Sequence, residues 1–86
     1  MPATDAAPLL TVYGRSYCHL CDDMIAALHT LQGRFVFMLK IVDVDTDAAL
    51  EARFGVKVPV LMSGNRELCH YYLDEPVVTA FLSDLR

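Results

Sequence analysis

The sequence predicts a single α/β domain in which helices flank a four-stranded mixed sheet, with the element order β-α-β-α-β-β-α. Three observations carry this prediction. The first half places an amphipathic segment between two short apolar runs, as a βαβ unit does. The second half has two β-rich runs around a glycine-asparagine turn, which is typical of an antiparallel hairpin. The chain has 86 residues, enough for one domain and too few for two.

The first strand and the first helix are predicted from adjoining patterns. Residues 9–13 form a short β-rich run that Gly14 ends. Within residues 21–31, apolar side chains recur every three or four positions, which marks one face of a helix with Gly33 as its C′ residue. The chain between strand and helix is a short loop, so Cys18 lies at the N-terminus of the helix.

The middle of the chain predicts a second strand and a short helix. Residues 35–44 are apolar at both alternating parities apart from two charged positions, so we expect a central strand that is covered on both faces. Residues 45–47 supply N-cap side chains for a helix at residues 48–54, which Gly55 stops.

The last third predicts a hairpin and a closing helix. Val58-Pro59 opens a strand at residues 60–62, and a tight turn leads into its antiparallel partner at residues 66–68. Residues 69–72 have no regular pattern and are expected to be irregular. A helical stripe then follows Pro76, formed by Val77, Val78, Phe81, Leu82 and Leu85.

Composition and charge exclude several classes of protein. Hydrophobic residues make up 55% of the chain, enough for one core, and the net charge of −4 offers no positive field for a nucleic acid. The longest apolar run, residues 35–39, is far shorter than the roughly 20 residues of a membrane helix. Residues 1–8 resemble a flexible leader rather than a secretory signal. We therefore expect a cytoplasmic, monomeric domain at residues 9–86.

The pair Cys18 and Cys21 is the most informative feature of the sequence. The unpaired N–H groups and the dipole of a helix N-terminus favour a thiolate, which is the nucleophilic form of cysteine. A spacing of three residues on a helix brings the second sulfur within disulfide reach of the first. Cys18 is therefore the predicted nucleophile, and Cys21 is the predicted resolving thiol.

Metal binding and simple packing are the alternatives for these cysteines. Two buried cysteines can act as small apolar residues, although the polar loop before Cys18 argues against this. A tetrahedral zinc site is the other alternative, and its ligands would come from Cys18, His19, Cys21, Cys69 and His70. Structural zinc sites usually use two paired sets of ligands, so the spacing favours redox chemistry without a metal. Cys69 can be a third redox thiol or a small packed residue, and packing is favoured because buried free cysteine is common.

Residues next to the cysteines are candidates for substrate binding. His19 can stabilise the Cys18 thiolate or relay a proton, and it can equally be a solvated residue of the first turn. Arg15 can supply a countercharge for a thiolate or for a substrate carboxylate, or it can be an ordinary solvated arginine. Tyr17 belongs to the same loop and is placed with this group.

The chain resembles the glutaredoxin branch of the thioredoxin superfamily. The resemblance rests on residues 13–21 (Tyr-Gly-Arg-Ser-Tyr-Cys-His-Leu-Cys), on Val58-Pro59 and on the element order, and it covers nearly all of the chain after residue 8. Residues 42–45, 53–55 and 58–61 make it most similar to small bacterial glutaredoxin-like proteins of unassigned function. The resemblance implies a thioredoxin-like fold, a cis peptide before Pro59, and a Val58 backbone free to bond an extended thiol substrate.

Departures from the family pattern bear on the ligand. The family's glycine pair, which approaches glutathione, corresponds to residues 68–70 (Leu-Cys-His), where side chains fill the space that glycine leaves open. We therefore expect no tightly bound cofactor and a weak response to glutathione. The predicted function is thiol-disulfide exchange with a protein disulfide or a small thiol. The alternative is a binding module that uses the groove at Val58 and Pro59 for a partner peptide.

Overall fold

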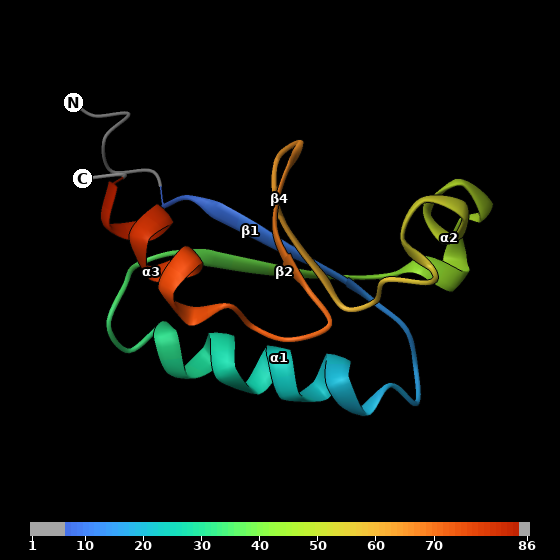
Figure 1. Cartoon of the computed structure of the whole chain (residues 1–86), viewed down its shortest axis with the longest axis horizontal. Coiled ribbons are helices and arrows are strands. Elements are labelled where there is room, and N and C mark those ends of the chain that lie inside the picture. The colour runs from blue at the N-terminus through green and yellow to red at the C-terminus, as the bar shows by residue number, and fades with distance from the viewer. Residues whose placement is uncertain (1–6, 85–86) are drawn as a thin grey trace.

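The computed structural model describes residues 7–84, and it confirms the predicted order of strands and helices (Figure 1). The predicted leader at residues 1–8 lies outside the described residues except for its last two positions, and so does Leu85. The elements are β1 (Leu9–Gly14), α1 (His19–Leu31), β2 (Met38–Asp43), a single 3-10 turn η2 (Val44–Thr46), α2 (Ala48–Phe54), β3 (Val60–Ser63), β4 (Arg66–His70) and α3 (Glu75–Asp84).

The four strands form one mixed sheet in the order β2-β1-β3-β4. β1 and β2 run parallel and are joined through α1, whereas β1–β3 and β3–β4 are antiparallel. Tyr13 near the end of β1 is opposite Val60 at the start of β3. This register brings the loop after β1 and the segment before β3 to the same end of the sheet.

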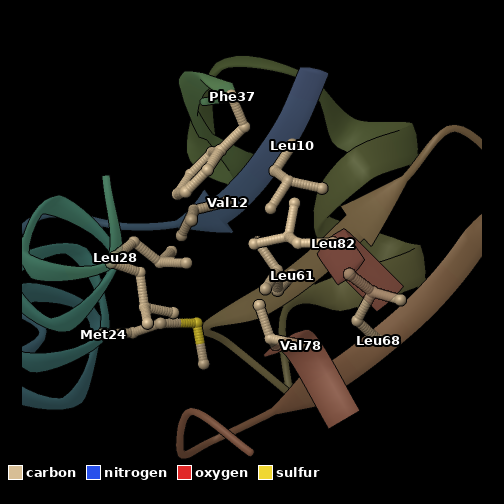
Figure 2. Close-up of a cluster of buried hydrophobic side chains, with 10 residues drawn as sticks. Leu10, Val12, Met24, Leu28, Phe37, Leu61, Leu68, Val78 and Leu82 are labelled. Carbon is tan, nitrogen blue, oxygen red and sulfur yellow. The ribbon is translucent and has the colours of Figure 1, made fainter. Parts of the chain in front are cut away.

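The two faces of the sheet are covered by different helices. α1 and α3 pack on one face, and Figure 2 shows side chains of both helices meeting those of β1, β3 and β4 there. The labelled members of this cluster are Leu10, Val12, Met24, Leu28, Phe37, Leu61, Leu68, Val78 and Leu82. A smaller cluster on the other face joins η2 and α2 to β3 through Val44, Phe54, Val60 and Met62. Alternation along β3 sends Leu61 to one cluster and its neighbours to the other.

The prediction of a central strand at residues 35–44 is wrong in length and in position. β2 spans only Met38–Asp43 and lies at the edge of the sheet. The side chains of Met38 and Ile41 are 61% and 54% exposed. A run of apolar residues at both alternating parities does not tell whether other elements cover the two faces of the strand. The seven-residue α2 packs on β3 and leaves β2 uncovered by it. Phe37 precedes the strand and is buried in the larger core cluster.

The hairpin is confirmed, but its second strand is longer than predicted. The prediction that residues 69–72 are irregular is wrong for the first two, because Cys69 is paired with Leu61 and His70 with Val60. An irregularity between Leu61 and Met62 shifts the register of this pair of strands. No helix within residues 7–84 is long and apolar enough to cross a membrane.

Candidate functional site

The start of α1 is built by a tight loop and a cysteine cap. Tyr17 has a φ of 58°, a left-handed conformation that residues other than glycine seldom adopt. It turns the chain directly before Cys18, which is the N-cap of α1 with an extended backbone. The backbone N–H of Cys21 donates a hydrogen bond of 3.1 Å to Sγ of Cys18. The predicted position of Cys18 at the helix N-terminus is therefore confirmed.

Cys18 and Cys21 are joined by a disulfide in the structure, with their Cα atoms 5.1 Å apart. The two sulfur-bearing residues have different surroundings. Cys18 is half-buried, whereas Cys21 is 3% exposed and packs against Gly14 at the end of β1. A Cβ atom on Gly14 would lie only 3.0 Å from Sγ of Cys21, so the glycine makes room for the inner sulfur. An external reactant therefore meets Cys18 first.

Val58 and Pro59 lie at the same end of the sheet as the cysteine pair. The peptide bond between them is cis, as the resemblance implies. Pro59 precedes β3 and lies beside the end of β1, and its carbonyl oxygen accepts a 2.8 Å hydrogen bond from the Tyr71 N–H. The backbone N–H and C=O of Val58 have no hydrogen-bond partner among residues 7–84. These two groups remain available to an extended chain.

Arg15 reaches toward η2 and α2. Its Nη2 lies 3.1 Å from Oε2 of Glu51 and 3.6 Å from Oδ1 of Asp45. The Nε atom is buried without a partner among the described residues. The guanidinium therefore ties the loop before Cys18 to the other face of the sheet, and its role as a countercharge remains a prediction.

His19 and Tyr17 are the most exposed of the predicted binding residues. The His19 side chain is 87% exposed, and its Nε2 lies 3.2 Å from Oδ2 of Asp23, one turn further along α1. The Tyr17 side chain is fully exposed at the rim of the site. Both side chains are open to solvent, and their role in substrate binding stays a prediction.

A charged cluster fixes the segment before Pro59, and the sequence analysis missed it. Oε1 of Glu67 lies 2.5 Å from Nζ of Lys57, and its Oε2 lies 2.7 Å from Nδ1 of His70. We call these three residues the Glu67 clasp. The hydrogen bond from Lys57 holds the pKa of Glu67 below its ordinary value, and the bond from His70 acts in the same direction. Tyr71 reinforces the clasp by donating a 3.0 Å hydrogen bond to the Val56 carbonyl.

Cys69 differs from the cysteine pair because it lies within a strand. It is a free, half-buried thiol that packs against the larger core cluster. Burial raises the pKa of the Cys69 thiol, and the backbone N–H of Asp74 partly opposes this. The Asp74 side chain caps α3 by accepting a 3.2 Å hydrogen bond from the Val77 N–H.

The residues proposed as zinc ligands do not assemble in the structure. Cys69 and His70 lie on β4, and His70 is held by Glu67. Within the part of the chain that the structure describes, no group of three or more histidine, cysteine, aspartate or glutamate side chains is arranged to hold a metal ion.

Comparisons with known proteins extend these observations. A family model described as "Glutaredoxin-like domain (DUF836)" matches residues 9–83. The solved structure of protein Ne2328 from Nitrosomonas europaea is 42% identical, with a TM-score of 0.80 over 88% of this chain and 92% of that chain. Protein XcR50 from X. campestris is also 42% identical, with a TM-score of 0.69 over 87% and 96% of the two chains.

More distant structures share the architecture alone. A thioredoxin from Halobacterium salinarum is 22% identical, with a TM-score of 0.62 over 96% of this chain and 78% of that chain. This likeness confirms the predicted thioredoxin-like fold. The search of curated proteins found no match to this chain.

Proposed function

The chain belongs to the glutaredoxin-like domain family (DUF836), and on that premise we propose that it is a thiol-disulfide oxidoreductase. The observation that carries the proposal is the asymmetry of the cysteine pair. Cys18 caps α1 and is accessible, whereas Cys21 is buried one turn further in, within disulfide reach. A helix N-terminus favours the thiolate, so the accessible sulfur is also the activated one.

The proposed reaction passes two electrons from the reduced pair to a partner disulfide. The Cys18 thiolate attacks one partner sulfur, forms a mixed disulfide and releases the first partner thiolate. The Cys21 thiolate then attacks Sγ of Cys18, releases the second partner thiolate and closes the intramolecular disulfide. Protons lost by the two cysteines end on the two partner thiols. A cellular thiol reductant must return the pair to its reduced state.

Recognition of the partner chain is assigned to Val58. Its free N–H and C=O lie at the same end of the sheet as the cysteine pair and can bond an extended backbone as a short antiparallel strand. The Glu67 clasp supports this arrangement because it fixes Lys57, the residue before Val58. His19, Tyr17 and Arg15 complete the rim that a partner would contact.

We propose that the partner is a protein disulfide rather than glutathione. Leu68, Cys69 and His70 lie on β4, at the positions where the resemblance to glutaredoxins implies a glycine pair that approaches glutathione. A cytoplasmic setting supplies the reductant that the cycle requires. Efficient turnover of a glutathionylated test peptide would contradict the preference for proteins.

Trapping of the mixed disulfide tests the proposed function. Cys21→Ser keeps the nucleophile but removes the resolving thiol, so it should accumulate a covalent adduct with a disulfide peptide through Cys18. Cys18→Ser is the matched control and should form no adduct. Intact-mass measurement followed by peptide mapping identifies the bonded cysteine. If neither variant forms an adduct, the chain is a binding module whose cysteines do no chemistry.

A further inference from the structure

A groove opens beside the cysteine pair on the side of β2. Figure 1 places the start of α1 and the end of β2 toward the same end of the molecule. The groove has a volume of about 210 Å³, and we call it the α1–β2 groove. It is lined by Gly14, Arg15, Ser16, Cys21, Asp22, Ile25, Ile41, Val42 and Asp43. β2 and β3 flank β1 on opposite sides, so the groove and Val58 lie on opposite sides of the end of β1.

The wall of the α1–β2 groove combines apolar and acidic side chains. Ile25, Ile41 and Val42 provide its apolar surface, and Ile41 remains 54% exposed because β2 is an edge strand. Asp22 and Asp43 bring two carboxylates, and neither is in an ion pair with any residue between 7 and 84. Oδ1 of Asp43 accepts a 2.8 Å hydrogen bond from the Asp45 N–H, and this bond leaves Oδ2 of Asp43 free.

The basic side chain that lines the groove and the one next to Val58 are both bound to carboxylates. Arg15 is paired with Glu51 and Asp45, and Lys57 is paired with Glu67. His19 lies beside Asp23 and adds no free positive charge. The charge left uncompensated at the rim of the cysteine pair is therefore negative. Such a surface attracts a cationic partner and repels an anionic one over about one Debye length.

We propose that the α1–β2 groove receives a lysine or arginine side chain of the partner protein whose disulfide reacts at Cys18. This inference rests on the proposed function and names its substrate class. A long basic side chain fits both parts of the wall, because its methylene stem covers apolar surface while its charged head reaches a carboxylate. The partner backbone would lie along Val58, and a flanking residue would turn across the end of β1 into the groove.

Matched peptides test this assignment. Each peptide carries one cysteine joined as a mixed disulfide to thionitrobenzoate, whose release is read by absorbance, and differs only in the flanking residue. The flanking residue is lysine, glutamine, glutamate or 2,4-diaminobutyrate, which carries the lysine charge on a shorter stem. Each rate with the reduced protein is divided by the rate of the same peptide with dithiothreitol. This normalisation removes the intrinsic reactivity of each peptide.

We expect the lysine peptide to react about fivefold faster than the glutamine peptide at low ionic strength, and the glutamate peptide to react more slowly. The diaminobutyrate peptide should lose most of the gain, because its stem is too short to reach across the apolar wall. Asp22→Asn and Asp43→Asn should each lower the lysine-to-glutamine ratio, and asparagine preserves the cap at residue 43. Asp84→Asn at the end of α3 changes the net charge equally and should leave the ratio unchanged.

The outcomes separate this inference from the proposed function. Equal rates for lysine and glutamine peptides would overturn the groove assignment while leaving the exchange activity intact. An equal fall of the ratio in Asp22→Asn and Asp84→Asn would also overturn it, because the effect would then come from the overall field. No reaction with any peptide would instead contradict the oxidoreductase itself. A change in Cys18 ionisation in Asp22→Asn affects all peptides alike and does not move the ratio.

Discussion

Two cysteine-histidine dipeptides occur in this chain, and both histidines lie beside a carboxylate, whereas the two cysteines differ in backbone position. His19 lies 3.2 Å from a carboxylate oxygen of Asp23, and His70 lies 2.7 Å from one of Glu67. Cys18 caps a helix and has a second cysteine one turn away. Cys69 lies within β4 and is a free thiol.

The difference teaches that the fold, not the dipeptide, sets the chemistry of each sulfur. The first turn of α1 directs backbone N–H groups toward Cys18, and the Cys21 N–H already donates to its sulfur. Cys69 lies within β4 instead, where burial raises the pKa of its thiol and one backbone N–H, that of Asp74, partly opposes this. Both sulfurs are half-buried, but only Cys18 lies at a helix N-terminus, which favours the thiolate.

The largest expected difference between the two dipeptides appears when the cysteine of each is replaced by serine. Cys18→Ser should reduce disulfide exchange to the uncatalysed rate, because no other accessible thiolate remains. Cys69→Ser should leave the rate within about twofold of the parent, since a half-buried thiol with a raised pKa takes no part. Initial rates with a disulfide peptide measure both variants. Loss of activity in Cys69→Ser with its fold intact would show that the second dipeptide is also functional.

Alkylation of the reduced protein gives the next largest difference. Iodoacetamide at pH 7 should label Cys18 first, and Cys69 at least about tenfold more slowly. The pKa of Cys69 lies above the ordinary value of 9.0, so its thiolate forms at higher pH than that of an exposed cysteine. Labelling of Cys69 should therefore accelerate only at that higher pH. Peptide mapping over a pH series reads the order. Faster labelling of Cys21 or Cys69 than of Cys18 would show that Cys18 is not the nucleophile.

A smaller effect is expected from the contact that buries the inner sulfur. Gly14→Ala places a Cβ atom 3.0 Å from Sγ of Cys21, and such overpacking costs about 1–3 kcal/mol of stability. Thermal unfolding of the reduced proteins measures the loss as a lower Tm. The same change in a Cys21→Ala background should be milder, because the crowded sulfur is gone. Equal losses in both backgrounds would place the strain elsewhere.

The smallest expected effect concerns the Glu67 clasp. A lowered pKa means that Glu67 adds stability above its ordinary value of 4.5, and that this contribution disappears as the pH falls through the lower folded-state pKa. Glu67→Gln should therefore lose about 0.2–1 kcal/mol at pH 7 and progressively less as the pH falls below 4.5. Chemical denaturation at several pH values checks this. Lys57→Met should remove most of this pH dependence of stability. If the stability difference between the parent and Glu67→Gln did not change with pH, the proposed role of the Glu67 clasp would be wrong.

Local sequence signals predicted most of the elements that build the site. Gly14 marks the end of β1, the spacing after Cys18 marks α1, and the Gly-Asn turn marks the hairpin. The side chain of Asp47 accepts the Ala49 N–H at 2.8 Å, as expected for an N-cap. Each of these signals acts within a few residues, so a sequence alone contains it.

Features that depend on distant pairing could not be predicted. The coverage of β2 depends on where α2 packs, and the apolar pattern of the strand does not report this. Arg15 meets Glu51 across 36 positions of the chain, and Lys57 meets Glu67 across 10. Single charged residues at such separations carry no pattern, so the α1–β2 groove and the Glu67 clasp became visible only in the folded chain.

The reduction midpoint of the Cys18–Cys21 pair tests the central claim most directly. The protein is equilibrated in a series of glutathione redox buffers, quenched with a thiol-trapping reagent, and scored by mass. We expect a single two-electron transition at about −120 to −270 mV, the range of known Cys-x-x-Cys oxidoreductases, and the same midpoint in Cys69→Ser. A pair that stays reduced when glutathione disulfide dominates would contradict it.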